Sequence, residues 1–263
     1  NSASEISSST KSVMILPELR GEIISGEIKS KNDQNSVNSI SIGLSIPGEN
    51  FFFKVVKTNP SGKLTMTFPV KYEDTPSAKN WIGTPAEKPT SVNYEEGVYV
   101  GYRYFNTFKI NPSYEFGFGL SYTSFDVSDI KLSSSTFENK MNISVTVKNN
   151  GNTAGKEVVQ LYLSAPTKTI DKPTSELKAF AKTNVLQPGE SQTLTLTLNP
   201  KELASFISEK NAWIAEAGNY TVALGTSSLN IKQTANFSLA KEIMVEKTHS
   251  AFAADNQFAD LKN

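Results

Sequence analysis

The sequence predicts an all-β protein whose second half is a complete antiparallel β-sandwich. Between residues 123 and 240, apolar and polar residues alternate at period two in a series of short segments. Turn-forming clusters at residues 149–155 and 187–190 separate these segments at sandwich-like spacing. Residues 200–207 have the pattern of a short helical turn that begins with proline. We therefore expect a seven-stranded sandwich over residues 123–240.

Composition and charge exclude several classes of function. The 263 residues have room for two modest domains, and 26 basic residues balance 26 acidic ones. The chain therefore has no net field to attract nucleic acid or an anionic membrane, and no apolar run is long enough to span a bilayer. Cysteine is absent and His249 is the only histidine, so we expect no disulfide, no metal site and no cofactor.

The first 70 residues predict a polar leader followed by a small β module. Residues 1–16 are rich in serine, as in the remainder after signal-peptide removal or at a fragment boundary, and we expect a secreted, periplasmic or cell-surface protein. The module at residues 17–70 should contain four antiparallel strands. Their expected positions are residues 22–30, 39–46, 51–58 and 63–70.

Residues 71–122 predict an irregular linker that ends in an aromatic, glycine-rich segment. Three prolines and Trp81 lie in its first part, which favours a long surface loop. Its second part, residues 98–122, is called the aromatic tract below. The alternation of aromatic residues at its start fits an extended segment, and Gly101, Gly117 and Gly119 would allow a neighbouring group to approach closely. After the sandwich, residues 241–263 should form a final strand or short helix and then a disordered tail.

The aromatic tract has two possible functions. Its rings could form an apolar seam between two layers of protein, since large aromatic side chains dominate interface burial. They could also form a platform on which a sugar stacks. Weak candidates for substrate binding are Trp81, Tyr102, Arg103 and Tyr104. For Trp81 the alternative is a hydrophobic plug that pins its loop, and for Arg103 it is a structural ion pair rather than a ligand clamp.

Several phrases of the sequence resemble the C-terminal region of glycoside hydrolase family 3, the β-glucosidases and β-xylosidases. Residues 97–105 (GVYVGYRYF) and 116–122 (FGFGLSY) are similar to the family's junction between its second and third domains. Residues 59–69 (NPSGKLTMTFP) resemble the end of its α/β sandwich domain. Residues 148–162 and 176–180 resemble its fibronectin type III-like, immunoglobulin-like domain. Residues 17–68 instead resemble a carboxypeptidase regulatory-like β-sandwich.

The resemblance implies that the catalytic groups of the family lie elsewhere. Retaining glycosidases use two carboxyl groups, a nucleophile and an acid/base. In the family the nucleophile is an aspartate of an N-terminal barrel, and the acid/base is a glutamate that in some members follows an Ile-Ser-Gly phrase. The phrase Ile24-Ser25-Gly26-Glu27 makes Glu27 a candidate remnant of that acid/base, but its apparent strand context favours a structural residue. The resemblance therefore implies that this chain alone does not hydrolyse β-glucosides.

Two functions of different class follow. In the first, the chain is the non-catalytic accessory portion of a family 3 β-glycosidase, and its partners are the catalytic domains. In the second, it is a stand-alone secreted or surface β-sandwich protein that binds a glycan, such as a β-linked saccharide, or a protein partner. An exposed aromatic tract would favour the first function, and a tract buried against residues 17–68 would favour the second.

Overall fold

The computed structural model describes residues 41–46, 52–57, 62–80, 82–83, 87–88, 90–249 and 261–263. The chain forms two compact units, Asn1–Thr65 and Met66–Asn263. Within the described residues, no helix combines the length and the apolar character that crossing a bilayer requires.

The N-terminal unit contains one β-hairpin among its described residues. Strands β1 (Ser41–Ile46) and β2 (Phe52–Lys57) pair antiparallel, which confirms the two middle strands expected for this module. The expected strand at residues 63–70 is wrong, because only Phe68 makes a bridge, to Tyr114. Pro69 follows Phe68 and has no N–H to continue the ladder. The leader, the expected strand at residues 22–30 and Glu27 lie outside the described residues.

The larger unit is built on a seven-stranded sandwich, as the sequence predicted. One sheet has the order β3-β4-β7 and the other the order β11-β10-β5-β6, and all pairs are antiparallel. Inward-facing positions of both sheets form one core, in which Ile143, Leu161 and Leu224 are fully buried. The strands are β3 (Phe125–Leu132), β4 (Met141–Asn149), β5 (Val158–Ser164), β6 (Glu176–Lys182), β7 (Ser191–Leu198), β10 (Gly218–Gly225) and β11 (Ile231–Leu239).

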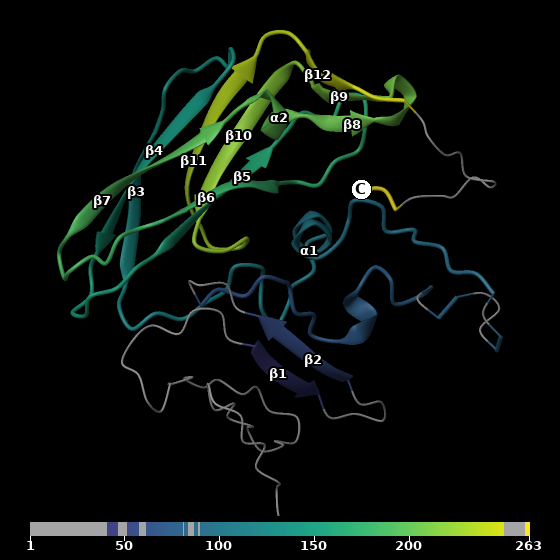
Figure 1. The fold of residues 1–263 in the computed structure, drawn as a ribbon, viewed down its shortest axis with the longest axis horizontal. Coiled ribbons are helices and arrows are strands. Elements are labelled where there is room, and N and C mark those ends of the chain that lie inside the picture. The colour runs from purple at the N-terminus through teal and green to yellow at the C-terminus, as the bar shows by residue number, and fades with distance from the viewer. Residues whose placement is uncertain are drawn as a thin grey trace, which may run out of the picture. The chain divides into compact units, whose positions relative to one another are not determined.

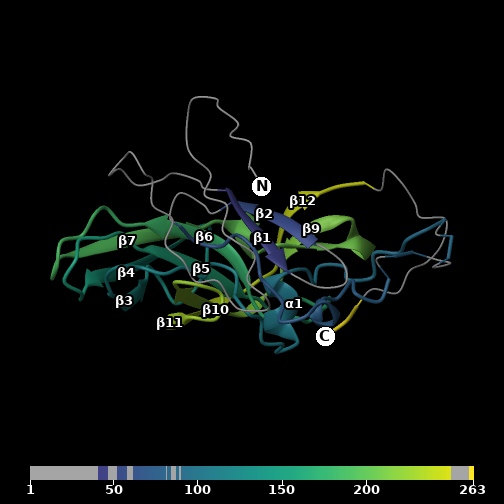
Figure 2. The same cartoon turned by 90° about the horizontal axis from the view of Figure 1, so that it is seen from below.

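A second, smaller sheet was not expected. Helix α2 (Pro200–Leu203) confirms the helical turn, and a capping box between Asn199 and Glu202 begins it. The chain then forms β8 (Ser205–Ile207), a 3₁₀ turn (Ser208–Lys210) and β9 (Ala212–Ala215). Strand β12 (Ile243–Lys247), the expected final strand, pairs with β9. In both views the small sheet and helix α1 lie at the same end of the sandwich (Figures 1 and 2).

The start of the aromatic tract is helical rather than extended, which corrects the sequence prediction. A 3₁₀ turn (Tyr72–Asp74) precedes the tract, and α1 (Tyr102–Thr107) begins after Gly101. Gly101 has φ = +58°, and nothing lies within 4 Å of its Cβ position. Its backbone conformation, rather than the close approach of a neighbouring group, therefore favours glycine there. The helix places Tyr102 and Phe105 three residues apart on its packed face, and Phe105 is 3% exposed. Packing thus overrides the β-propensity of the aromatic residues.

Gly117 lies against the sandwich, as the sequence predicted for a position of close approach. Its φ is +83°, and a Cβ atom there would lie 2.5 Å from Nε2 of Gln160, a residue of β5. Gln160 is 4% exposed, and its Oε1 accepts a 2.5 Å hydrogen bond from the Tyr162 hydroxyl. The Gln160 side chain is therefore held in place beneath Gly117.

We expect Gly117→Ala to lower the free energy of unfolding by about 2–3 kcal/mol, through overpacking and left-handed strain. Gly189→Ala is the matched control, because Gly189 has φ = +82° but nothing within 4 Å of its Cβ position. That control should cost only about 1 kcal/mol. Equal losses in denaturant melts of the two variants would show that Gln160 does not restrict position 117.

Candidate functional site

Tyr102 joins the aromatic tract to the sandwich. Its ring centroid lies 5.7 Å from that of Tyr162 on β5 and 5.0 Å from that of Phe116. Its hydroxyl oxygen accepts a 2.8 Å hydrogen bond from the backbone N–H of Leu177 on β6. Tyr102 therefore packs on the sandwich: its ring contacts other aromatic rings, and its hydroxyl group is hydrogen-bonded to β6.

Polar contacts fasten the same tract to two loops of the sandwich. The Tyr99 hydroxyl donates a 2.6 Å hydrogen bond to Asp171, and burial raises the pKa of Tyr99, as does this carboxylate. On the second loop, the Ser227 hydroxyl donates to Glu115 at 2.7 Å, and the Ser228 N–H donates to the Phe116 carbonyl at 2.9 Å. The surface that covers the packed side of the tract is therefore the sandwich itself, which neither sequence-based alternative anticipated.

The other sequence candidates have different surroundings. Arg103 pairs with Glu176 at 3.1 Å, and Lys178 shares that carboxylate at the same distance, so Arg103 forms the structural ion pair that was the alternative to a ligand clamp. The Tyr104 ring is half-buried against Phe105 and Phe108 of its own segment. Trp81 and Glu27 lie outside the described residues. The only histidine, His249, is exposed, and no cluster of three or more potential metal ligands occurs in the described part of the chain.

A groove that the sequence analysis did not identify lies on the small sheet. Pairing of β8, β9 and β12 aligns Phe206, Trp213 and Glu246 in one row across the three strands. Phe206 is 38% exposed and Trp213 is 42% exposed, while their strand neighbours Ile207 and Ile214 are fully buried. All four residues of β9 are apolar (Ala212, Trp213, Ile214 and Ala215), so no apolar/polar alternation in the sequence indicated that the tryptophan faces outward.

The cavity beside this row has a volume of about 460 Å³ and is called the Trp213 groove here. Helix α1, the loop before β6, β6 itself, and the segment from α2 to β8 all contribute to its lining. The two rings have centroids 5.6 Å apart and planes inclined by 57°. Charged groups of both signs line the cavity: Arg103, Asp171, Lys172, Glu176, Lys178, Lys201 and Glu246.

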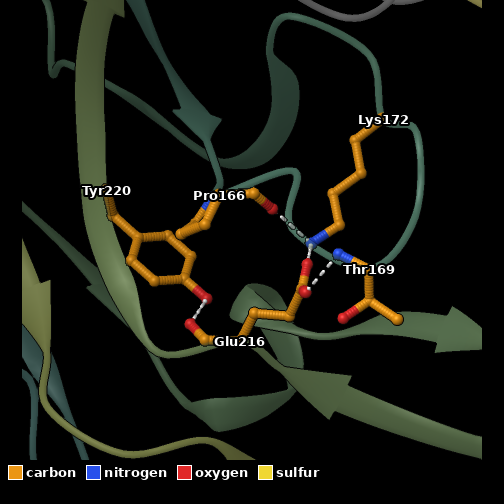
Figure 3. A network of polar contacts seen from close by, with 5 residues as sticks. All are labelled: Pro166, Thr169, Lys172, Glu216 and Tyr220. Carbon is orange, nitrogen blue, oxygen red and sulfur yellow. Dashed lines mark hydrogen bonds and ion pairs between the residues drawn. The ribbon is translucent and has the colours of Figure 1, made fainter.

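Lys172, one of these charged residues, forms a buried ion pair with Glu216 beside the groove (Figure 3). The side chains of Lys172 and Glu216 are each 4% exposed, and the Lys172 ammonium contacts the Glu216 carboxylate directly. The ammonium also donates to the Pro166 carbonyl at 2.6 Å, and the Thr169 N–H donates to Glu216 at 2.9 Å. The Tyr220 hydroxyl donates to the backbone carbonyl of Glu216 at 2.8 Å. The pair thus ties the loop after β5 to the turn before β10.

The pKa of Glu216 gives this pair a pH dependence. Burial alone would raise the pKa of the carboxyl, but hydrogen bonds from Lys172 and Thr169 together with the lysine charge bring it below its ordinary value of 4.5. A carboxyl whose pKa is lower in the folded than in the unfolded chain stabilises the fold when it is ionised. The contribution of Glu216 to the free energy of unfolding is therefore present above about pH 4.5, and it is lost as the pH falls through the lower folded-state pKa.

Glu216→Gln should accordingly flatten the acid side of the stability profile. We expect the variant to be less stable than wild type at pH 7 and to lose less of its remaining stability between about pH 5 and pH 3. Urea melts at each pH measure both quantities. Parallel profiles for the two proteins would contradict a lowered pKa for Glu216.

Comparison with known proteins shows which domain the larger unit contains. Residues 157–228 match the fibronectin type III-like domain. The solved β-glucosidase 3B of Thermotoga neapolitana in complex with α-D-glucose superposes with a TM-score of 0.65 and is 48% identical, covering 70% of this chain and 25% of that one. The larger unit of the chain thus contains a fibronectin type III-like β-sandwich domain.

Curated relatives show which part of a longer protein this chain resembles. Thermostable β-glucosidase B of Acetivibrio thermocellus is 38% identical over 200 residues, which are 75% of this chain and 26% of the relative. β-Glucosidase A of Butyrivibrio fibrisolvens is 42% identical over 212 residues, covering 73% of this chain and 25% of the relative. The chain spans about a quarter of the length of these relatives, and the match is to their C-terminal portion. About 70% of the chain corresponds to the C-terminal region of glycoside hydrolase family 3 β-glucosidases.

Proposed function

We propose that this chain acts as the accessory C-terminal region of a family 3 β-glycosidase, docking on the catalytic part of the enzyme through its aromatic tract. A continuous match over 75% of a 263-residue chain must include the middle of the sequence, so the tract belongs to the part shared with those enzymes. Hydrolysis of β-glucosides would be the activity of the assembled protein.

Exposure of apolar side chains along the tract is the observation that carries this proposal. Tyr102 and Phe116 pack on the sandwich, whereas Val100, Leu120 and Tyr122 are 58%, 81% and 75% exposed. Several large apolar side chains exposed within one segment favour an interaction surface. The rest of a family 3 enzyme is the partner expected for a segment that these enzymes share.

A fusion protein tests the docking surface. The matched C-terminal quarter of Thermotoga neapolitana β-glucosidase 3B would be replaced by residues 66–263 of this chain, and turnover of an aryl β-glucoside measured. We expect an active fusion, and we expect Leu120→Asp to reduce its activity or assembly by about tenfold or more, as when a charge is buried at an interface.

Phe180→Asp is the matched control, because Phe180 is 71% exposed but lies on β6, outside the tract. It should leave turnover of the fusion unchanged. Equal activity of the Leu120→Asp and Phe180→Asp fusions would contradict docking through the tract, and a folded but inactive parent fusion would contradict the accessory function.

A stand-alone β protein that binds a glycan is the second candidate function. The Trp213 groove is the observation that favours it, because its exposed aromatic pair lies in a cavity lined by donors and acceptors. Saccharide binding by the unfused chain, together with a folded but inactive parent fusion, would favour this candidate over the first.

A further inference from the structure

The Trp213 groove combines a fixed aromatic surface with polar groups at its edge. Phe206 and Trp213 stand opposite each other on paired strands, and the buried residues Ile207, Ala212 and Ile214 hold those strands from beneath. Glu246 continues the row on β12. Since the rings belong to strands rather than to a loop, the surface that they present is already formed before a ligand binds.

Polar side chains around the rings can reach a ligand. Lys201, the second residue of α2, and Glu246 line the cavity, and neither forms an ion pair with another residue in the described part of the chain. Arg103, Glu176 and Lys178 form a linked set of charges in the same lining. Together these groups offer both hydrogen-bond donors and acceptors.

The balance of charges indicates the kind of ligand. Cationic and anionic groups are interspersed in the lining, so the groove has no single-sign field to select a phosphate, a nucleic acid or a metal ion. A volume of about 460 Å³ is within the usual range for small-ligand sites. A pyranose matches this lining, because its apolar C–H face can lie on an aromatic ring while its hydroxyl groups point toward charged side chains at the rim.

We propose that the Trp213 groove is a binding site for a neutral pyranose oligosaccharide. The sugar would stack on Trp213, with Phe206 extending the apolar surface. Lys201 would donate hydrogen bonds to hydroxyl groups of the sugar, and Glu246 would accept them. The four side chains given a role here lie on α2, β8, β9 and β12, outside the aromatic tract, so the site stands independently of the docking function proposed above.

Fluorescence titration of the full chain tests this site. The chain has two tryptophans, so Trp81→Phe leaves Trp213 as the sole tryptophan reporter. Cellopentaose, laminaripentaose, xylopentaose and maltopentaose are the probes. We expect saturable quenching with at least one of them, confirmed by isothermal titration calorimetry on the wild-type chain.

Matched variants then locate the binding. Trp213→Ala should weaken binding by about tenfold or more, as expected for loss of a central aromatic contact. Phe206→Ala, Lys201→Ala and Glu246→Ala should each weaken it by about threefold or more. Phe180→Ala removes an aromatic residue that is 71% exposed outside this groove and should leave the affinity unchanged.

Three results would overturn the proposal. The first is the absence of binding to all four saccharides at about 10 mM, the upper limit of a weak specific site. The second is binding that persists in both Trp213→Ala and Phe206→Ala but is lost in Trp81→Phe, which would assign it to Trp81. The third is a concentration-dependent dimer that Trp213→Ala abolishes, without saccharide binding, which would identify a second copy of the chain as the occupant.

Discussion

Lys172→Met is expected to lower the free energy of unfolding by about 3–5 kcal/mol, because it leaves the buried carboxylate of Glu216 without its counter-charge. Both side chains are 4% exposed, so water cannot replace the lost ammonium. The Pro166 carbonyl also loses its 2.6 Å donor. Chemical denaturation at pH 7, monitored by circular dichroism, measures the loss.

An exposed ion pair on the same unit provides the matched control. The side chains of Lys210 and Glu242 are 43% and 50% exposed and lie 3.4 Å apart, so Lys210→Met should cost less than about 1 kcal/mol. The double variant Lys172→Met/Glu216→Leu should recover much of the stability lost in Lys172→Met, since no unpaired charge then stays buried. A Lys172→Met loss as small as that of Lys210→Met would show that the buried pair does not stabilise the fold.

The sandwich could be predicted from the sequence because its strands carry local signals. Alternating segments at residues 125–132 and 191–198 have the same bounds as β3 and β7. Those at residues 142–149, 157–163, 176–183 and 219–225 agree with β4, β5, β6 and β10 within one residue at each end. In β4, β7 and β10 one face packs on the core and the other is more exposed, so the period-two alternation of the sequence matches the structure. β5 is buried on both faces.

The aromatic tract could not be predicted in the same way, because its conformation depends on distant partners. The contacts of Tyr102 with β5 and β6 involve residues about 60 to 75 positions later in the chain. Nothing local distinguishes a helical Tyr102–Thr107 from an extended aromatic segment, apart from the glycine that precedes it. The Trp213 groove was also hidden, since its lining comes from segments that lie far apart in the sequence.

Tyr102→Ala is the second change with a large expected effect, about 3–4 kcal/mol of unfolding free energy. The substitution removes ring contacts with Phe116 and Tyr162 and leaves the Leu177 N–H without its acceptor. Burial raises the pKa of Tyr162, which is consistent with a dry environment beneath the Tyr102 ring. The loss should therefore combine a cavity with an unsatisfied donor. Thermal and urea melts of the full chain provide the measurement.

Two related variants separate these contributions. Tyr102→Phe keeps the ring and should cost only about 1 kcal/mol, the usual value of one hydrogen bond. Tyr104→Ala should cost less than Tyr102→Ala, about 1–2 kcal/mol, because the ring contacts of Tyr104 are with Phe105 and Phe108 of the tract itself. If Tyr102→Ala instead left the main unfolding transition unchanged and added a separate early transition, the tract would unfold independently of the sandwich. If all three variants melted as wild type does, the packing of the tract on β5 and β6 would contribute nothing to stability.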